Sequence, residues 1–60
     1  MKYKELIKLI EADGWYMVSS NKHRKYRHRT KSGLLTIPFH TGEIPTGTAM
    51  RILKDARIKS

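Results

Sequence analysis

The sequence predicts a small α+β domain in the order helix, strand, strand, strand, helix, with both helices on one face of a three-stranded antiparallel sheet. Three observations support this αβββα order. The two ends of the chain are amphipathic with helical spacing, and the middle holds three short β-rich stretches separated by turn residues. The chain has only 60 residues and no cysteine, so we expect one domain over residues 1–60, with a thin core and no disulfide.

The first helix is expected within residues 2–14. Charged residues alternate there with apolar ones at a spacing that places the apolar side chains on one helical stripe. Gly14 is a typical residue to end such a helix, because glycine adopts the left-handed backbone without strain. The predicted stripe consists of Tyr3, Leu6, Ile7, Leu9 and Ile10.

Three strands are expected in the middle of the chain, at residues 15–19, 23–29 and 34–40. The first two are separated by a polar break, and the last two by a turn at residues 30–33 that contains a glycine. Pro38 has no backbone N–H to donate to a neighbouring strand. The third strand is therefore predicted to lie at an edge of the sheet.

Side chains alternate between the two faces of a strand, which predicts the two faces of this sheet. In the second strand, Arg24, Tyr26 and His28 share one face, and Tyr26 is expected to face the helices. The opposite, open face would then hold His23, Lys25, Arg27 and Arg29. In the third strand, the helix side is predicted to be Leu35, Ile37 and Phe39, and the open side Thr36, Pro38 and His40.

The second helix is expected to begin after Thr48, whose hydroxyl suits an N-terminal cap. Its buried stripe is predicted to be Ala49, Met50, Ile52, Leu53, Ala56 and Ile58. Three aromatic residues of the strands, Trp15, Tyr16 and Tyr26, are of a type that stacks on nucleic-acid bases. In so small a domain we expect them in the core instead.

Charge is unevenly distributed. The formal net charge is +8, and no acidic residue occurs between Gly14 and Gly42. Such a charge attracts polyanions, so the expected partners are nucleic acid, an acidic protein, or both. The N-terminus does not resemble a signal peptide, and no apolar run reaches the roughly 20 residues of a membrane span. We therefore expect a soluble, cytoplasmic protein.

The basic segment KHRKYRHRTK, residues 22–31, allows three interpretations. It can be a solvated face, although such faces usually mix both signs of charge. It can also be a surface that grips nucleic acid, since Arg and Lys both bind phosphate. Finally, it can dock an acidic protein partner. The one-signed charge favours nucleic acid.

The histidines add a catalytic possibility. A zinc site is unexpected, because there are no thiolates and the spacing of His23, His28 and His40 fits no common ligand pattern. Cations near a histidine favour its neutral form, and a neutral imidazole can act as a general base. If RNA is bound, such a base can take the proton from a 2′-OH, and nearby cations can stabilise the charge that builds on the phosphate. No metal or cofactor is predicted.

Three segments together resemble the HicA toxins, which are small mRNA interferases of toxin–antitoxin pairs. KELIKLIEADGW is similar to the first helix of that family. SSNKHRKYRH is similar to its loop–histidine–strand segment, GSHHxxφRH, in which φ is apolar or aromatic. TIPFHTGEIPTGTAMRILKDARI is similar to its final strand, loop and helix. The resemblance covers nearly the whole chain and implies a fold like that of double-stranded-RNA-binding domains.

The resemblance also implies specific roles. It makes His23 the catalytic histidine of a metal-independent mRNA endoribonuclease, and it gives His28 and His40 a secondary, structural or RNA-facing place. The sequence departs from the family pattern at Asn21-Lys22, which replaces Gly-Ser, and at Arg24, which replaces a second histidine. The implied partner is an antitoxin of the HicB type, in a hetero-oligomer. The candidate RNA-binding residues are Lys22, Arg24, Lys25, Arg27 and Arg29.

Overall fold

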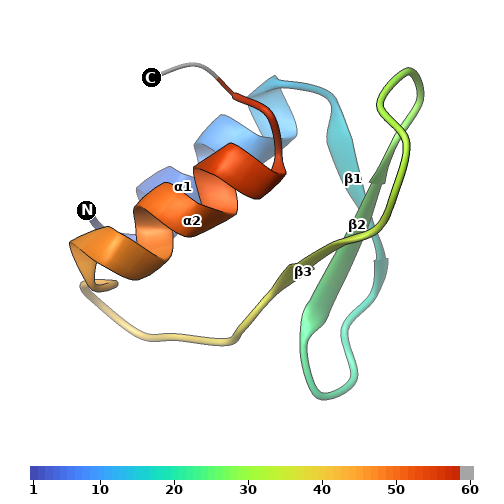
Figure 1. The fold of residues 1–60 in the computed structure, drawn as a ribbon. Coiled ribbons are helices and arrows are strands. Elements are labelled where there is room, and N and C mark those ends of the chain that lie inside the picture. Colours follow the sequence, from blue (N-terminus) through green and yellow to red (C-terminus); the bar gives the residue numbers. More distant parts are fainter. Residues whose placement is uncertain (59–60) are drawn as a thin grey trace.

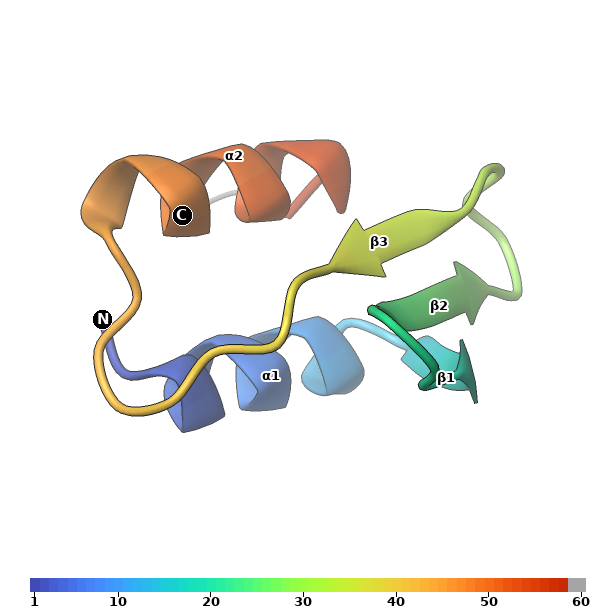
Figure 2. The same cartoon turned by 90° about the horizontal axis from the view of Figure 1, so that it is seen from below.

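The computed structural model describes residues 1–58, which form two layers, a pair of helices and a sheet (Figure 1). The two helices lie side by side, run in the same direction and cover one face of the sheet (Figure 2). The predicted αβββα order is confirmed. No helix within these residues has the length and apolar character needed to cross a membrane. The elements are α1 (Tyr3–Ala12), β1 (Trp15–Ser19), β2 (Arg24–His28), β3 (Leu35–Ile37) and α2 (Thr46–Asp55).

The sheet is an antiparallel meander with strand order β1-β2-β3. β2 is the central strand, where Trp15 pairs with His28 and Arg24 pairs with Ile37. β3 lies at an edge, as Pro38 predicted. Two strands are shorter than expected: β2 begins one residue after His23, and β3 ends before Pro38. The proline ends the strand because it cannot continue the ladder.

The core is apolar and lies between the helices and the sheet. Tyr26 is fully buried, which confirms the predicted orientation of β2. No charged or polar residue is buried among those that the structure describes. The buried residues are Tyr3, Leu6, Ile10, Trp15, Tyr26, Leu35, Ile37, Ile44, Ala49, Ile52, Leu53 and Ala56.

Four apolar residues predicted to be buried are about half exposed: Leu9, Tyr16, Phe39 and Met50. The helical residues Leu9 and Met50 lie on the flanks of stripes centred on their neighbours, so they point sideways from the sheet. Tyr16 follows buried Trp15 on β1, and strand alternation turns it to the open face. Phe39 lies beyond the end of β3, where strand alternation no longer applies.

The helix ends agree only partly with prediction. Gly14 ends α1 as expected: its backbone has φ +110°, and its N–H donates to the Glu11 carbonyl at 3.0 Å. The predicted cap at Thr48 is wrong, because α2 begins at Thr46 and the residue at its N-cap is Pro45, three residues earlier than predicted. Pro45 precedes it with φ −54°, a value close to that of a helix, so the chain enters the helix there.

The segment after β3 is tied to the N-terminus of the chain. The Tyr3 N–H donates to the Gly42 carbonyl at 2.9 Å, and the Ile44 N–H donates to the Met1 carbonyl at 3.0 Å. The N-terminal ammonium forms an ion pair with Glu43 at 3.1 Å. These contacts hold residues 39–42 against the start of α1, far from β2 in the sequence but close to its first residue in space.

Candidate functional site

The structure distributes the predicted RNA-binding and catalytic residues over four places. The loop before β2 carries Lys22 and His23, and the open face of the sheet carries Lys25 and Arg27. Arg24 points to the helix side, and Arg29 follows the end of β2. The five predicted RNA-binding cations therefore do not share one face.

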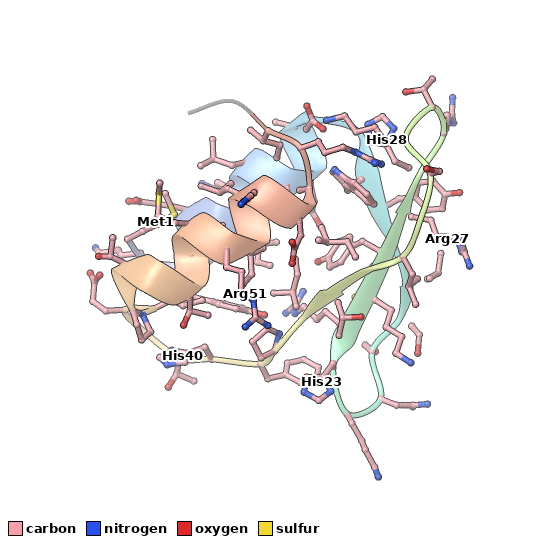
Figure 3. All side chains as sticks on the ribbon, viewed as in Figure 1. Met1, His23, Arg27, His28, His40 and Arg51 are labelled. Atoms are coloured by element: carbon pink, nitrogen blue, oxygen red, sulfur yellow. The ribbon has the colours of Figure 1, made fainter. Side chains whose placement is uncertain are left out.

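His23 is solvent-exposed in the bend that precedes β2. Within residues 1–58 its ring has no hydrogen bond and no ion pair. Figure 3 shows it at one end of the sheet, with His28 at the opposite end of the same strand. Its two ring nitrogens are therefore free to accept a proton from a bound molecule or to donate one to it.

The open face is basic and carries one exposed aromatic ring. Lys25 and Arg27 are exposed on the central strand. Tyr16 pairs with Arg27 from β1, and Thr36 pairs with Lys25 from β3. A row of cations along a central strand, with no acid beside it, suits the phosphates of a nucleic-acid backbone. Sequence reasoning placed Tyr16 in the core, although its alternation with Trp15 was the signal for the open face.

Arg24 lies between two aromatic rings on the helix side of β2. Its guanidinium carbon is 5.9 Å from the centre of the Tyr3 ring and 5.6 Å from that of Phe39. Its Nη1 donates a long hydrogen bond of 3.5 Å to the Tyr26 hydroxyl, which raises the pKa of Arg24. Burial raises the pKa of the Tyr3 hydroxyl, against the opposing effect of the Arg24 charge.

A hollow of about 450 Å³ opens beside these groups. Two polar atoms at Arg24 and Tyr3, the Nε and the hydroxyl, are buried and have no hydrogen-bond partner within residues 1–58. The His40 ring lies at 6.5 Å from that of Tyr3, and its Nδ1 is 3.1 Å from the Thr41 carbonyl. The residues that line the hollow are Tyr3, Lys4, Arg24, Phe39, His40, Thr41 and Gly42. We call Tyr3, His23, Arg24, Phe39 and His40 the open end.

His28 is integrated into the fold at the other end of β2. Its Nδ1 accepts from the backbone N–H groups of Thr30 at 3.1 Å and Lys31 at 3.2 Å. Because Nδ1 accepts, Nε2 carries the proton, and it donates to the Asp13 carbonyl at 2.7 Å. The ring also packs edge-on against Trp15 at 5.2 Å. These contacts favour a structural role for His28 over an RNA-facing one.

Lys31 joins the ends of both helices at the same place. Its ammonium donates to the Asp13 carboxylate at 2.5 Å, just after α1, and to the carbonyls of Ala56 and Arg57 at 3.1 and 3.0 Å, just after α2. The hydrogen bond from Lys31 lowers the pKa of Asp13, against the effect of its partial desolvation. Lys31 is therefore engaged in the fold. We call Asp13, Trp15, His28, Lys31 and Arg57 the closed end.

Within the described part of the chain, no three His, Asp or Glu side chains gather as a metal ion would require. The residues that sequence reasoning missed are Tyr3, Lys4 and Phe39 of the hollow. No sequence signal marks them, because the backbone contacts of Gly42 and Ile44 bring the two segments together.

Comparison with known proteins places the chain in a family. A family model described as the HicA toxin of bacterial toxin–antitoxin systems matches residues 3–58. The chain belongs to the HicA toxin family. It is therefore a toxin of a toxin–antitoxin pair, and membership implies pairing with an antitoxin. A search of curated proteins found no match.

Proposed function

We propose that this toxin is an mRNA endoribonuclease in which His23 acts as the general base. The observation that carries the proposal is the exposed, unpartnered imidazole of His23 at the end of a basic strand, in a chain that matches the HicA model. Of the three histidines, His28 has both ring nitrogens engaged by the fold. Within residues 1–58, neither ring nitrogen of His23 has a partner, so His23 is the better candidate for proton transfer.

The proposed reaction uses the RNA, side chains of this protein and water. The neutral His23 imidazole takes the proton from a 2′-OH, and the resulting oxygen attacks the adjacent phosphorus. The bond from phosphorus to the 5′-oxygen breaks, and that oxygen takes up a proton from water or from a lysine as it leaves. The upstream fragment then ends in a 2′,3′-cyclic phosphate, and the downstream fragment begins with a 5′-hydroxyl. Proton transfer from a positioned side chain typically contributes about 10²–10⁴-fold to the rate.

The exposed cations around His23 are proposed to hold the RNA. Lys22 lies beside it in the loop, and Lys25 and Arg27 follow on the open face. Arg29 extends the basic surface beyond the end of β2. Contacts of this kind fix the register of the backbone without reading sequence. They also stabilise the extra negative charge of the transition state.

The antitoxin is proposed to be of the HicB type and to neutralise the toxin by covering this surface. The net charge of +8 favours an acidic or RNA-mimicking partner surface. Such an interaction would form quickly and weaken as salt increases, because its long-range attraction is screened.

A second function remains in competition: a non-catalytic RNA-binding module. The observation that favours it is the open face itself, whose cations can grip a backbone without any chemistry. The two functions differ in what they require of His23. A passive binder needs no proton acceptor there, whereas the nuclease loses its base when the imidazole is removed.

The deciding experiment is an RNA cleavage assay in excess EDTA with the wild type and His23→Ala. Asn21→Ala serves as a matched control, since Asn21 is an exposed residue of the same loop. Folding is checked by circular dichroism, and RNA binding is measured separately. We expect His23→Ala to bind RNA and to cut it at least about 100-fold more slowly, while Asn21→Ala remains active. If the wild type binds RNA without cutting, even with ribosomes present, the binding module is the better description.

A further inference from the structure

We propose that the hollow at the open end is a nucleotide subsite, in which one base of the RNA stacks on Phe39 while its phosphate meets Arg24 and Lys4. This inference rests on the proposed function, because it takes RNA as the ligand. It adds a specific contact to a base, which the cations of the open face do not provide.

The lining of the hollow has the chemistry of a nucleotide site. Phe39 is 49% exposed although it is a large apolar residue, so much of its ring is available for a flat partner. Lys4 and Arg24 supply positive charge at the same place, and no acidic residue of the described part of the chain lines the hollow. Proteins that bind single-stranded nucleic acid combine these two features, an aromatic platform and a cationic wall.

Two polar groups beside the hollow lack hydrogen-bond partners within residues 1–58. The guanidinium of Arg24 has no carboxylate within ion-pair distance in residues 1–58, and its Nε has no acceptor. The nearby Tyr3 hydroxyl is equally unpartnered, in a residue that is only 7% exposed. Buried polar groups without partners are rare in native proteins. Both atoms lie below the water-accessible surface, so a small movement of the Arg24 side chain would be needed to bring its Nε to a phosphate in the hollow.

The hollow lies where such a contact is useful to catalysis. Arg24 is the residue directly after His23, so the wall of the hollow and the proposed base are consecutive in the chain. The labelled side chains of His23 and His40 lie along the same lower side of the molecule in Figure 3. A base held on Phe39 would therefore position a neighbouring 2′-OH and phosphate at the imidazole.

The observations favour a nucleotide over an acidic peptide. Cations alone would suffice for a carboxylate side chain, whereas the hollow also presents the rings of Tyr3, Phe39 and His40. Its volume of about 450 Å³ lies within the range of small-ligand sites in proteins. An acidic peptide on this site is therefore the alternative outcome of the test below.

The test uses a short 2′-O-methylated oligoribonucleotide, which has no 2′-OH to react and so reports binding alone. Its affinity is measured by fluorescence anisotropy for the wild type, Phe39→Ala and Phe39→Trp. Leu34→Ala is the matched control, since Leu34 is 45% exposed at the opposite end of β3. We expect Phe39→Ala to weaken binding by roughly 5- to 150-fold, the loss of one stacked base. Phe39→Trp and Leu34→Ala are expected to bind like the wild type.

Further measurements separate this inference from the proposed function. In a series of oligonucleotides that each lack one base, the wild type and Phe39→Ala should bind with equal affinity only when the missing base is the one that stacks on Phe39. Equal binding of the oligonucleotide by Phe39→Ala and the wild type would overturn the subsite. Poly-glutamate serves as the probe for an acidic peptide, and a loss of affinity in Phe39→Ala for poly-glutamate alone would also overturn it. The His23→Ala variant should bind the oligonucleotide normally. If Phe39 affects binding while the wild type cuts no RNA, the subsite stands and the nuclease proposal fails.

Discussion

The two ends of the central strand use the same kinds of residue for opposite purposes. At the closed end, His28 has partners on both ring nitrogens, and Lys31 has three acceptors. At the open end, His23 has no partner within the described residues, and Arg24 has only one long hydrogen bond. A partnered polar group stabilises the fold, whereas an unpartnered one is available to a ligand.

The difference follows from where the helices end. Both α1 and α2 finish at the closed end, where their last carbonyl groups carry partial negative charge. Lys31 and His28 satisfy those groups. α1 begins at the open end, where its first residues line the hollow without a side-chain cap. The electrostatics of the helices therefore attract the cations of the chain at one end and favour an external anion at the other.

The largest expected effect is on stability, from Gly14→Ala. A Cβ at this position would lie 2.7 Å from Nε2 of His28, and the backbone φ of +110° is strained for any residue with a side chain. We expect a loss of about 2–4 kcal/mol in the free energy of unfolding. A chain of this length has about 3–9 kcal/mol in total. Urea denaturation followed by Trp15 fluorescence measures the loss.

Gly33→Ala is the control for this variant. Gly33 also has a positive φ, of +94°, but nothing lies within 4 Å of its added Cβ. The excess loss in Gly14→Ala over Gly33→Ala therefore reports the contact with His28. Equal losses in the two variants would mean that the closed end tolerates the displacement of His28, contrary to our account of it.

A comparison of the two histidines gives the next effect. His28→Ala removes the acceptor for two backbone N–H groups, the donor to Asp13 and the packing on Trp15, so it should cost about 1–3 kcal/mol of stability. His23→Ala removes an exposed side chain and should change stability by less than about 0.5 kcal/mol. Thermal denaturation of both variants checks the difference.

RNA cleavage should rank the same two variants in reverse. At a temperature where both are folded, His28→Ala is expected to retain cleavage and His23→Ala to lose it. If folded His28→Ala were inactive while His23→Ala remained active, the catalytic histidine would be His28, and the roles that we assign to the two ends would be reversed.

Much of the fold could be predicted from the sequence because its signals are local. The helical stripes, the glycine that ends α1 and the alternation around Tyr26 each depend on neighbouring residues, and the structure agrees with them. The errors also have local causes. Pro45 allows α2 to begin before Thr48, and β3 ends at Ile37, which exposes Phe39.

The candidate site was less predictable because it depends on contacts between distant segments. The basic run identified His23 and its neighbouring cations, but a charge pattern cannot tell which lysine is engaged in the fold. Lys31 belongs to the same run and is bound to the ends of both helices. The hollow needs the pairing of Gly42 with Tyr3, which no periodicity in the sequence marks.

A smaller effect is expected on the salt dependence of RNA binding. Lys25→Gln and Arg27→Gln each remove one exposed cation from the open face. The slope of log K against log salt should fall in magnitude by about 0.7 for each lost contact to single-stranded RNA. Lys54→Gln, on α2, is the control and should leave the slope unchanged. An equal change in all three would show that net charge, rather than the open face, determines binding.

The smallest effect concerns acid and tests whether Lys31 and Asp13 act as a pair. Lys31 lowers the pKa of Asp13 in the folded protein below its ordinary value of 3.8. The resulting stabilisation is complete above that value and is lost as the pH falls through the lower, folded pKa. We expect the coupling between Asp13→Asn and Lys31→Met, measured by urea denaturation of the single and double variants, to be present near pH 7 and to weaken as the pH falls below 3.8. Because Lys31 also binds the carbonyls that follow α2, Lys31→Met should destabilise the protein more than Asp13→Asn at neutral pH. An absence of coupling near pH 7 would mean that Lys31 acts through these carbonyls alone, and that the charge of Asp13 contributes nothing to the closed end.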